Sequence, residues 1–463
     1  METDTTESEY VMVEMPDNQV SNNNIINVIK EWEGCLKGKE ITSTRQRHIE
    51  KVPPLLLEGK RGRRNREYYE PAVVSLGPYH YKRSRLAQAE EYKLMTLEEF
   101  RLSTRMTTYD LYNKVFEVVH DARNCYIDGS TDAYNDEEFS RMMLRDGCFV
   151  LFYIECISYA KNKMLLNNEY LGALGFANVT RDIFLLENQL PFVVLKVLLE
   201  LRFPSDKGED ILNRFFNYLK YGEVFTKDEK VLGNKQPLHL LELYRSYFIL
   251  LPVSLGLVSI GLFSAKSTKI WSDDDYNYVK RNRNFPSATE LKSQWIFLRR
   301  ALDKDIAFYS RCCYGVFELP TRAVSTSTKV IFLNMIAYEL CAHNPNDFRV
   351  STYIKIMKTL IVKNDDVKEL TKKNIMIHSL GHDEQVVKMY DEIDVPAVNL
   401  YMFSQFRQVI NSHLDNKYKT WAGELITDYF GSPWKMLGLL TAAAILFTTF
   451  LQTYFGAKQL PDR

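Results

Sequence analysis

Four polar residues in apolar surroundings are the candidates for acid–base chemistry in this chain: His80, Asp146, Glu187 and Glu339. An imidazole and carboxyl groups that lie close together can exchange protons with a bound substrate. The same residue types also form buried networks that hydrogen-bond to one another and fix the register of packed helices. The residues alone therefore leave two interpretations open, a catalytic carboxylate and histidine site or a structural network.

The local context of these residues favours the structural interpretation. Gly77 and Pro78 are turn residues, so a rigid corner would orient the side chain of His80. Glu187 lies shortly before Pro191, where polar side chains commonly cap the free amides of a helix start. Glu290 is one more carboxylate that could join such a cluster across helices.

Motif searches give no strong enzymatic signal. The sequence lacks HExxH, CxxC, GxSxG, a GxxxxGK[ST] phosphate loop and a GxGxxG fingerprint, and its eight histidines are scattered. We therefore expect no metal and no cofactor. Lysine plus arginine and aspartate plus glutamate both number 59, which argues against nucleic acid as an obligatory partner. A protein partner of unknown identity is the expectation that remains.

The carboxyl-terminal region predicts a membrane anchor. From Met436 to Ala457 the chain carries no charge, and a helix of that length would cross a bilayer. We expect a transmembrane helix over 434–457, with Met436, Leu440, Phe447 and Ala457 in the span and a short tail over 458–463. Because the amino terminus has no secretory signal, we expect a single-pass anchor, most simply in the plasma membrane, with the large domain in the cytosol.

The remaining pattern predicts a mainly α-helical protein. Residues 1–44 read as a disordered acidic tail, and 45–430 as one large multi-helix globular domain with variable loops at 203–235 and 264–286. The uncharged stretch 246–265 is long enough for a second span, and a hydrophobic surface facing lipid or a partner is a further alternative. Buried core is favoured because Pro252, Gly256 and Gly261 lower the helix propensity of the stretch. Helices are expected from Ser84 to about Arg105, from Asn135 through Ile157, from Pro191, from Ser325 or Thr326 through Leu340, and over 398–429.

A set of motifs extends over nearly the whole chain from about His48 onward. They are VSLGPYH (Val74 to His80), EEYK (Glu90 to Lys93), LRDGCFVLFYI (Leu144 to Ile154), RDIFLLENQLPFVVL (Arg181 to Leu195), HLLEL (His239 to Leu243), ATEL (Ala288 to Leu291), NMIAYE (Asn334 to Glu339) and DDVKELTKKNIMIHSLG (Asp365 to Gly381). In this order the motifs resemble the plant "domain of unknown function 247" family, also called uncharacterised protein family 0481. After ATEL the chain departs from the family, which usually has a small residue or glycine where this chain has Gln294 and Trp295.

The resemblance implies a membrane-tethered, mainly helical plant protein with no agreed enzymatic activity. Some members at grass self-incompatibility loci are linked with pollen recognition, which implies a role in interaction or recognition. We therefore expect an interaction or recognition protein. The alternative is an uncharacterised enzyme whose site gathers His80, Asp146, Glu187 and Glu339.

Overall fold

The computed structural model describes residues 47–58, 65–159, 172–224, 231–232, 236–248, 285–301, 306–310, 314–344, 347–414 and 433–458. The chain divides into two units, Met1–Gln46 and Arg47–Arg463. The first unit, and with it the expected acidic tail 1–44, lies outside the described residues. Most of the stretch 246–265 also lies outside them.

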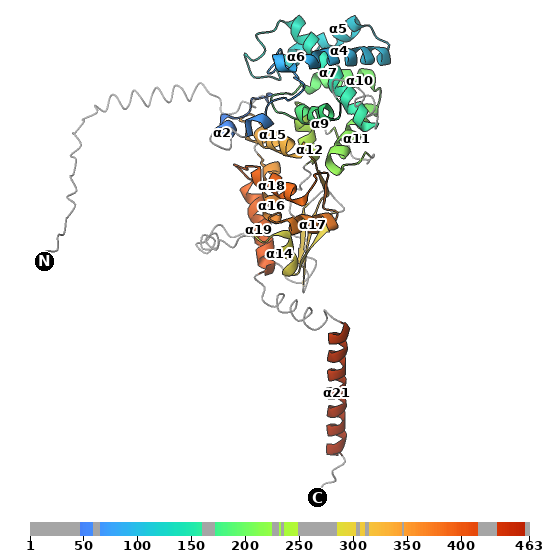
Figure 1. The fold of residues 1–463 in the computed structure, drawn as a ribbon, viewed down its shortest axis with the longest axis vertical. Coiled ribbons are helices and arrows are strands. Elements are labelled where there is room, and N and C mark those ends of the chain that lie inside the picture. Colours follow the sequence, from blue (N-terminus) through green and yellow to red (C-terminus); the bar gives the residue numbers. More distant parts are fainter. Residues whose placement is uncertain are drawn as a thin grey trace, which may run out of the picture. The chain divides into compact units, whose positions relative to one another are not determined.

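The prediction of a mainly helical protein is confirmed (Figure 1). The helix expected from Asn135 begins there, and the side chain of Asn135 accepts a hydrogen bond from the backbone N–H of Glu138. The helix expected from Pro191 also begins at that residue. The helices are α2 (Pro54–Leu57), η1 (Arg66–Tyr68), η2 (Ser84–Leu86), α4 (Ala87–Thr104), α5 (Thr108–Phe116), α6 (Val119–Arg123), α7 (Asp136–Ser158), α9 (Gly172–Ile183), α10 (Phe192–Arg202), α11 (Lys207–Tyr221), α12 (Leu240–Phe248), α14 (Ala288–Ser293), α15 (Thr328–Leu340), α16 (Arg349–Leu360), α17 (Asn364–Lys372), α18 (Asp383–Glu392), α19 (Leu400–Leu414) and α21 (Pro433–Lys458).

One predicted loop is wrong. The segment 203–235 contains the 15-residue helix α11, whose buried residues Ile211, Leu212, Phe215 and Phe216 recur at helical spacing. Gly222 ends this helix in the left-handed conformation, with φ 78°. The polar, glycine-containing composition of the segment favoured a loop over this helical spacing. Of the other predicted loop, 264–286, residues 264–284 lie outside the described part of the chain.

Two small β-sheets were not anticipated from the sequence. Strands β1 (Ile296–Arg300), β2 (Ala307–Ser310) and β3 (Gly315–Leu319) form one sheet in the order β1-β3-β2, with β1 parallel and β2 antiparallel to β3. Strands β4 (Arg322–Val324) and β5 (Met376–His378) form a parallel pair. Each strand has only three to five residues, which is too short for a clear two-residue alternation.

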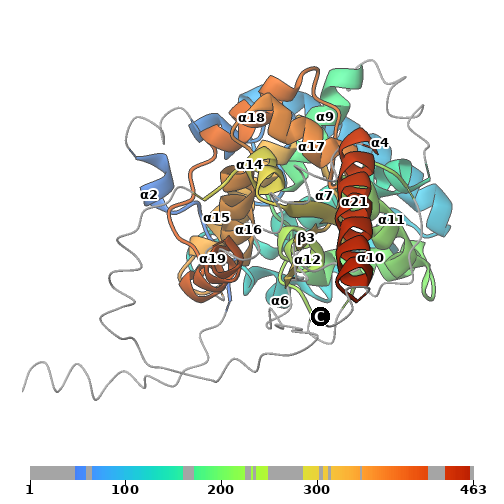
Figure 2. The ribbon, with the colours of Figure 1, turned by 90° about the horizontal axis from the view of Figure 1, so that it is seen from below.

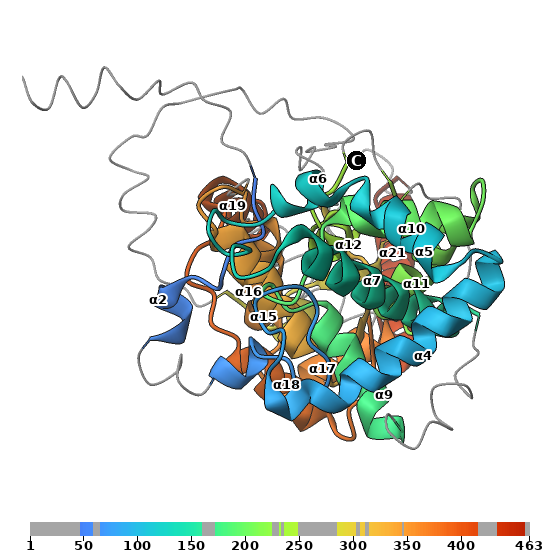
Figure 3. The ribbon, with the colours of Figure 1, turned by 90° about the horizontal axis from the view of Figure 1, so that it is seen from above.

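Helix α7 is the centre of the amino-terminal half of the domain. Helices α4, α5, α10 and α11 all pack against it (Figure 3). Almost every residue of α7 from Phe139 to Ser158 is buried, as expected for a helix covered on several faces. Gly147 permits the close approach of α10, because a Cβ atom there would clash with Cδ1 of Leu198.

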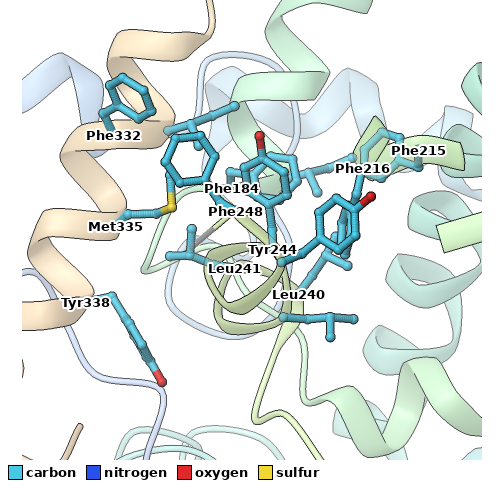
Figure 4. Packing of buried hydrophobic residues seen from close by; sticks show 14 of the residues in the cluster. Phe184, Phe215, Phe216, Leu240, Leu241, Tyr244, Phe248, Phe332, Met335 and Tyr338 are labelled. Atoms are coloured by element: carbon cyan, nitrogen blue, oxygen red, sulfur yellow. The ribbon is translucent and has the colours of Figure 1, made fainter. Parts of the chain in front are cut away.

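Aromatic side chains fill the space around α12. The rings of Phe184 and Tyr244 lie 5.0 Å apart, and those of Phe216 and Tyr244 lie 5.2 Å apart. In Figure 4 side chains of α12 lie between Phe332 and Met335 of α15 on one side and Phe215 and Phe216 of α11 on the other. This cluster joins the amino-terminal helices to the carboxyl-terminal ones.

A buried carboxylate joins α14 to α17, which lie side by side in Figure 2. Asp366 accepts hydrogen bonds from the hydroxyl of Ser287 and the backbone N–H of Thr289, both at 2.8 Å. The side chain of Ser287 also accepts a hydrogen bond from the backbone N–H of Glu290, so the first donors of α14 are satisfied. The side chain of Glu290 accepts in turn from the backbone N–H of Ser287, which completes a capping box.

The predicted transmembrane helix, and with it the single-pass membrane anchor and its localisation, is corrected by the structure. Within the part of the chain that the structure describes, no helix is long and apolar enough to cross a membrane. The segment instead forms α21, a helix of 26 residues. Of the four span residues predicted, Leu440 and Phe447 are exposed, and the side chains of Met436 and Ala457 lie outside the described residues.

The packing of α7 against α10 predicts the sign of one substitution. Gly147→Ala should destabilise the protein by up to about 2 kcal/mol, because the clash with the buried Leu198 side chain costs about 1 to 3 kcal/mol and the gain in helix propensity is only about 1 kcal/mol. Chemical unfolding measures this difference. Gly381→Ala, at an exposed glycine with ordinary contacts, is the matched control and should change stability by less than about 0.5 kcal/mol. A stabilised Gly147→Ala protein would show that the helices do not approach as described.

Candidate functional site

A buried carboxylate holds the loop that leads to His80. The backbone N–H groups of Ala72, Val73 and Val74 donate to Asp182 over 2.7 to 3.0 Å. Asp182 is fully buried, and Arg181 Nε lies 3.4 Å from its carboxylate. Burial raises the pKa of Asp182, while the three backbone donors oppose that rise. Its carboxylate therefore accepts the backbone hydrogen bonds that a neighbouring strand or a helical turn would otherwise accept.

The two amide residues after Glu187 continue this arrangement. Asn188 accepts from the backbone N–H of Leu76 at 2.7 Å and donates to the carbonyl of Val74 at 3.0 Å. Gln189 accepts from the backbone N–H of Leu241, at the start of α12, over 3.0 Å. Polar side chains of the segment Arg181 to Gln189 therefore bind both the loop before His80 and the start of α12.

Asp146 belongs to a buried charge cluster on α7. Its Oδ1 lies 2.7 Å from Nζ of Lys93, and its Oδ2 accepts from the backbone N–H of Gly77 at 2.8 Å. Lys93 also contacts Glu90 at 2.5 Å. Although burial alone would lower the pKa of Lys93, Asp146 and Glu90 raise it, so this amine stays charged. Asp146 thus links α7, α4 and the loop.

His80 and Glu187 form the one pair among the four predicted residues. His80 Nε2 lies 3.5 Å from a carboxylate oxygen of Glu187, and neither ring nitrogen makes a hydrogen bond with any described residue. Burial, then the charges of Arg83, Arg85 and Lys51, lower the pKa of His80 to about 3, so the imidazole is neutral. Burial raises the pKa of Glu187, whose other oxygen accepts from the backbone N–H of Val52 at 2.9 Å.

Glu339 lies in a third place, at the junction of α15 and α16. It accepts from Nη2 of Arg245 at 2.7 Å and from the backbone N–H groups of Val350 and Ser351 at 2.8 and 2.9 Å. Arg245 also contacts Asp347. This carboxylate caps the start of α16 and neutralises a buried guanidinium. Glu339 is therefore occupied by bonds within the chain.

The four predicted residues do not gather at one site. His80 and Glu187 meet, and the loop from Gly77 to His80 connects them to Asp146, but Glu339 binds other partners. Sequence reasoning missed Asp182, Lys93 and Arg245, because a single charged residue carries no spacing signal. Among the residues that the structure describes, no three histidine, cysteine, aspartate or glutamate side chains are placed to hold a metal ion.

A groove with a volume of about 810 Å³ is the second candidate site. It lies where α4 and α5 rest on α7, helices that are adjacent in Figures 1 and 3. Leu94 and Tyr109, which line the groove, are 52% and 72% exposed although their side chains are largely apolar. The lining residues are Tyr81, Leu94, Leu97, Thr108, Tyr109, Tyr112, Glu137, Glu138, Arg141, Leu144 and Arg145.

Buried neutral histidines predict a loss of stability in acid. Burial also lowers the pKa of His239 to about 3, whereas an unfolded histidine has a pKa near 6.5. The unfolded state therefore binds more protons between these pH values, and stability falls as the pH falls from about 6.5 toward 3. At pH 5 the loss is about 2 kcal/mol for each histidine, partly offset by carboxyl groups whose pKa is raised.

Urea unfolding at pH 7 and pH 5 tests this expectation. His239→Asn retains an acceptor for the backbone N–H of Glu242, which His239 Nδ1 now binds, and should reduce the acid loss by about 2 kcal/mol. His120→Asn, at an exposed histidine, is the control and should keep the full loss. An unchanged pH dependence in His239→Asn would contradict the assignment of a neutral buried imidazole.

Comparison with known proteins gives one consistent family. A model of the DUF247 family, plant protein of unknown function, matches residues 49–448. UPF0481 protein At3g47200 of Arabidopsis thaliana is 26% identical over 412 residues, covering 84% of this chain and 83% of that protein. UPF0481 protein At3g02645 of the same plant is 22% identical over 468 residues, covering 83% of this chain and 86% of that protein. No solved structure matches the chain. Since the family model covers most of its length, the chain belongs to the DUF247 family of plant proteins of unknown function.

Proposed function

We propose that this protein recognises another protein through the groove between α4 and α5. The observation that carries this proposal is the exposed apolar lining of the groove, in which Leu94 and Tyr109 face solvent. Exposed apolar surface of this kind is typical of binding sites, and tyrosine is enriched where proteins meet. Recognition between cells, as in self-incompatibility, is one setting in which such a module would act.

The polar clusters support a structural role for the residues that could otherwise do chemistry. Asp182 and Glu339 each accept several bonds from backbone N–H groups, and Asp146 neutralises the buried Lys93. Groups used in this way stabilise the frame on which a binding surface is built. In this proposal they position the groove and contact no ligand.

Paired variants on α4 test the proposal. Leu94→Asn should abolish specific partner binding, whereas Met95→Asn should retain it, because Met95 is similarly exposed but does not line the groove. A photo-reactive residue at Tyr109 in the full chain, expressed in plant tissue, should crosslink to a defined protein that is identified by mass spectrometry. Equal melting temperatures establish that both variants are folded. Partner binding that persists in Leu94→Asn, or no crosslinked protein at Tyr109, would contradict the proposal.

An enzyme remains the second candidate, because a carboxylate oxygen of Glu187 lies 3.5 Å from the buried imidazole of His80, whose two nitrogens make no hydrogen bond with any described residue. In the structural interpretation, Glu187→Gln lowers stability by about 1 to 3 kcal/mol, since it weakens the bond from Val52. Any loss of function should then follow the loss of folded protein. In the enzymatic interpretation, Glu187→Gln stays folded and keeps its partner but loses activity.

Glu339→Gln is the matched control for a structural carboxylate. Removing one partner of a buried ion pair typically costs about 3 to 5 kcal/mol, so this variant should lose stability in either interpretation. Thermal unfolding together with partner binding separates the two cases. A stable, inactive Glu187→Gln protein beside a destabilised Glu339→Gln protein would favour the enzyme over the recognition module.

A further inference from the structure

We propose that the groove between α4 and α5 binds an amphipathic helix of a partner protein, with a basic side chain at Glu137 and an acidic side chain at Arg141. This inference rests on the proposed recognition function and adds the shape and charge order of the partner. It follows from three features of the groove: its position among helices, its apolar lining and the pairing of its charges.

The position of the groove suits a helix. Helices α4 and α5 both pack on α7. A partner helix in the space between them would therefore be one more helix packed on α7. Among the described residues the strands β1 to β5 contribute nothing to the groove, so it has no sheet edge at which an extended peptide could pair. A helix satisfies its own backbone hydrogen bonds and needs only an apolar surface to bind.

The lining of the groove provides that apolar surface. Leu94 and Leu97 come from α4, Tyr109 and Tyr112 from α5, and Leu144 from α7. A partner helix that carries apolar residues at i, i+3 or i+4, and i+7 would bury them against these side chains. Its polar face would remain in solvent.

Some charged side chains at the groove already have a partner within the chain, and others do not. Glu138 pairs with Lys82 at 2.6 Å, and Arg145 donates to the hydroxyl of Tyr81 at 3.0 Å. Glu137 and Arg141 form no ion pair with any described residue; Arg141 Nε donates only to the backbone carbonyl of Glu137, at 3.3 Å. These two side chains therefore remain available to a partner.

The spacing of this free pair defines the complementary charges. Glu137 and Arg141 are four residues apart on α7, so they lie about 5 to 6 Å from each other on one face. A partner helix with a base and an acid one turn apart can contact both in one orientation. The reverse orientation places like charges together, so the pair selects the direction in which the partner lies.

Binding of two synthetic peptides to the full chain tests the inference. Each probe is a stapled helix of about 15 residues with leucines at i, i+4 and i+7, one with lysine and glutamate placed to face Glu137 and Arg141 and one with the two exchanged. We expect the first peptide to bind about tenfold more tightly by fluorescence anisotropy. The double variant Glu137→Arg, Arg141→Glu should reverse this preference.

A second charge exchange serves as the matched control. Glu98→Arg with Arg101→Glu exchanges an exposed pair on α4 that does not line the groove, and it should leave the preference unchanged. The inference is overturned if neither peptide binds, if the double variant does not reverse the preference, or if sedimentation shows that a second copy of the chain fills the groove. If a protein still crosslinks at Tyr109 in any of these cases, the recognition function stands and only the helical, charge-ordered partner is rejected.

Discussion

The backbone N–H groups from Ala72 to Gly77 lie in neither a helix nor a strand, and side chains bind them instead. Asp182, Asn188 and Asp146 together accept from five of these donors. A buried donor without an acceptor costs about 1 to 3 kcal/mol, so the loop could not be buried without these residues. Because Ala72 and Asp182 are 110 positions apart, the bonds also tie distant parts of the chain together.

This constraint reaches the groove through α7. Asp146 binds the loop at Gly77 and the amine of Lys93, which belongs to the helix that forms one wall of the groove. The next residue, Arg145, lines the groove and donates to the hydroxyl of Tyr81, from the same loop. A surface whose walls are fixed in this way loses little conformational entropy when a partner binds. The buried charges therefore hold in place the helices and the loop that form the walls of the exposed groove.

The sequence predicts those parts of the fold that have local chemistry. Asn135 shows where α7 begins because its side chain caps the first turn, and Pro191 shows where α10 begins. Helix α11 was missed because its segment is polar overall and contains glycine, although its apolar residues recur at helical spacing and Gly222 marks its end. At the site, the proximity of His80 and Glu187 depends on a fold that brings residues 107 positions apart together, and no spacing rule contains that information. The same holds for Lys93, which looks like an ordinary surface lysine until Asp146 is placed beside it.

Trp295 shows how the frame tolerates a departure from the family pattern. The resemblance leads us to expect a small residue or glycine here, and the backbone is indeed left-handed, with φ 61°, where a side chain costs about 1 to 2 kcal/mol. The turn from α14 into β1 persists because main-chain bonds form it: Gln294 donates to the carbonyl of Glu290, and the carbonyl of Trp295 accepts from Gly315 at 2.8 Å. The indole ring also contacts Phe297 edge to face at 5.9 Å, which returns part of the cost. The main-chain hydrogen bonds therefore hold this turn in a left-handed conformation even though tryptophan suits that conformation less well than glycine.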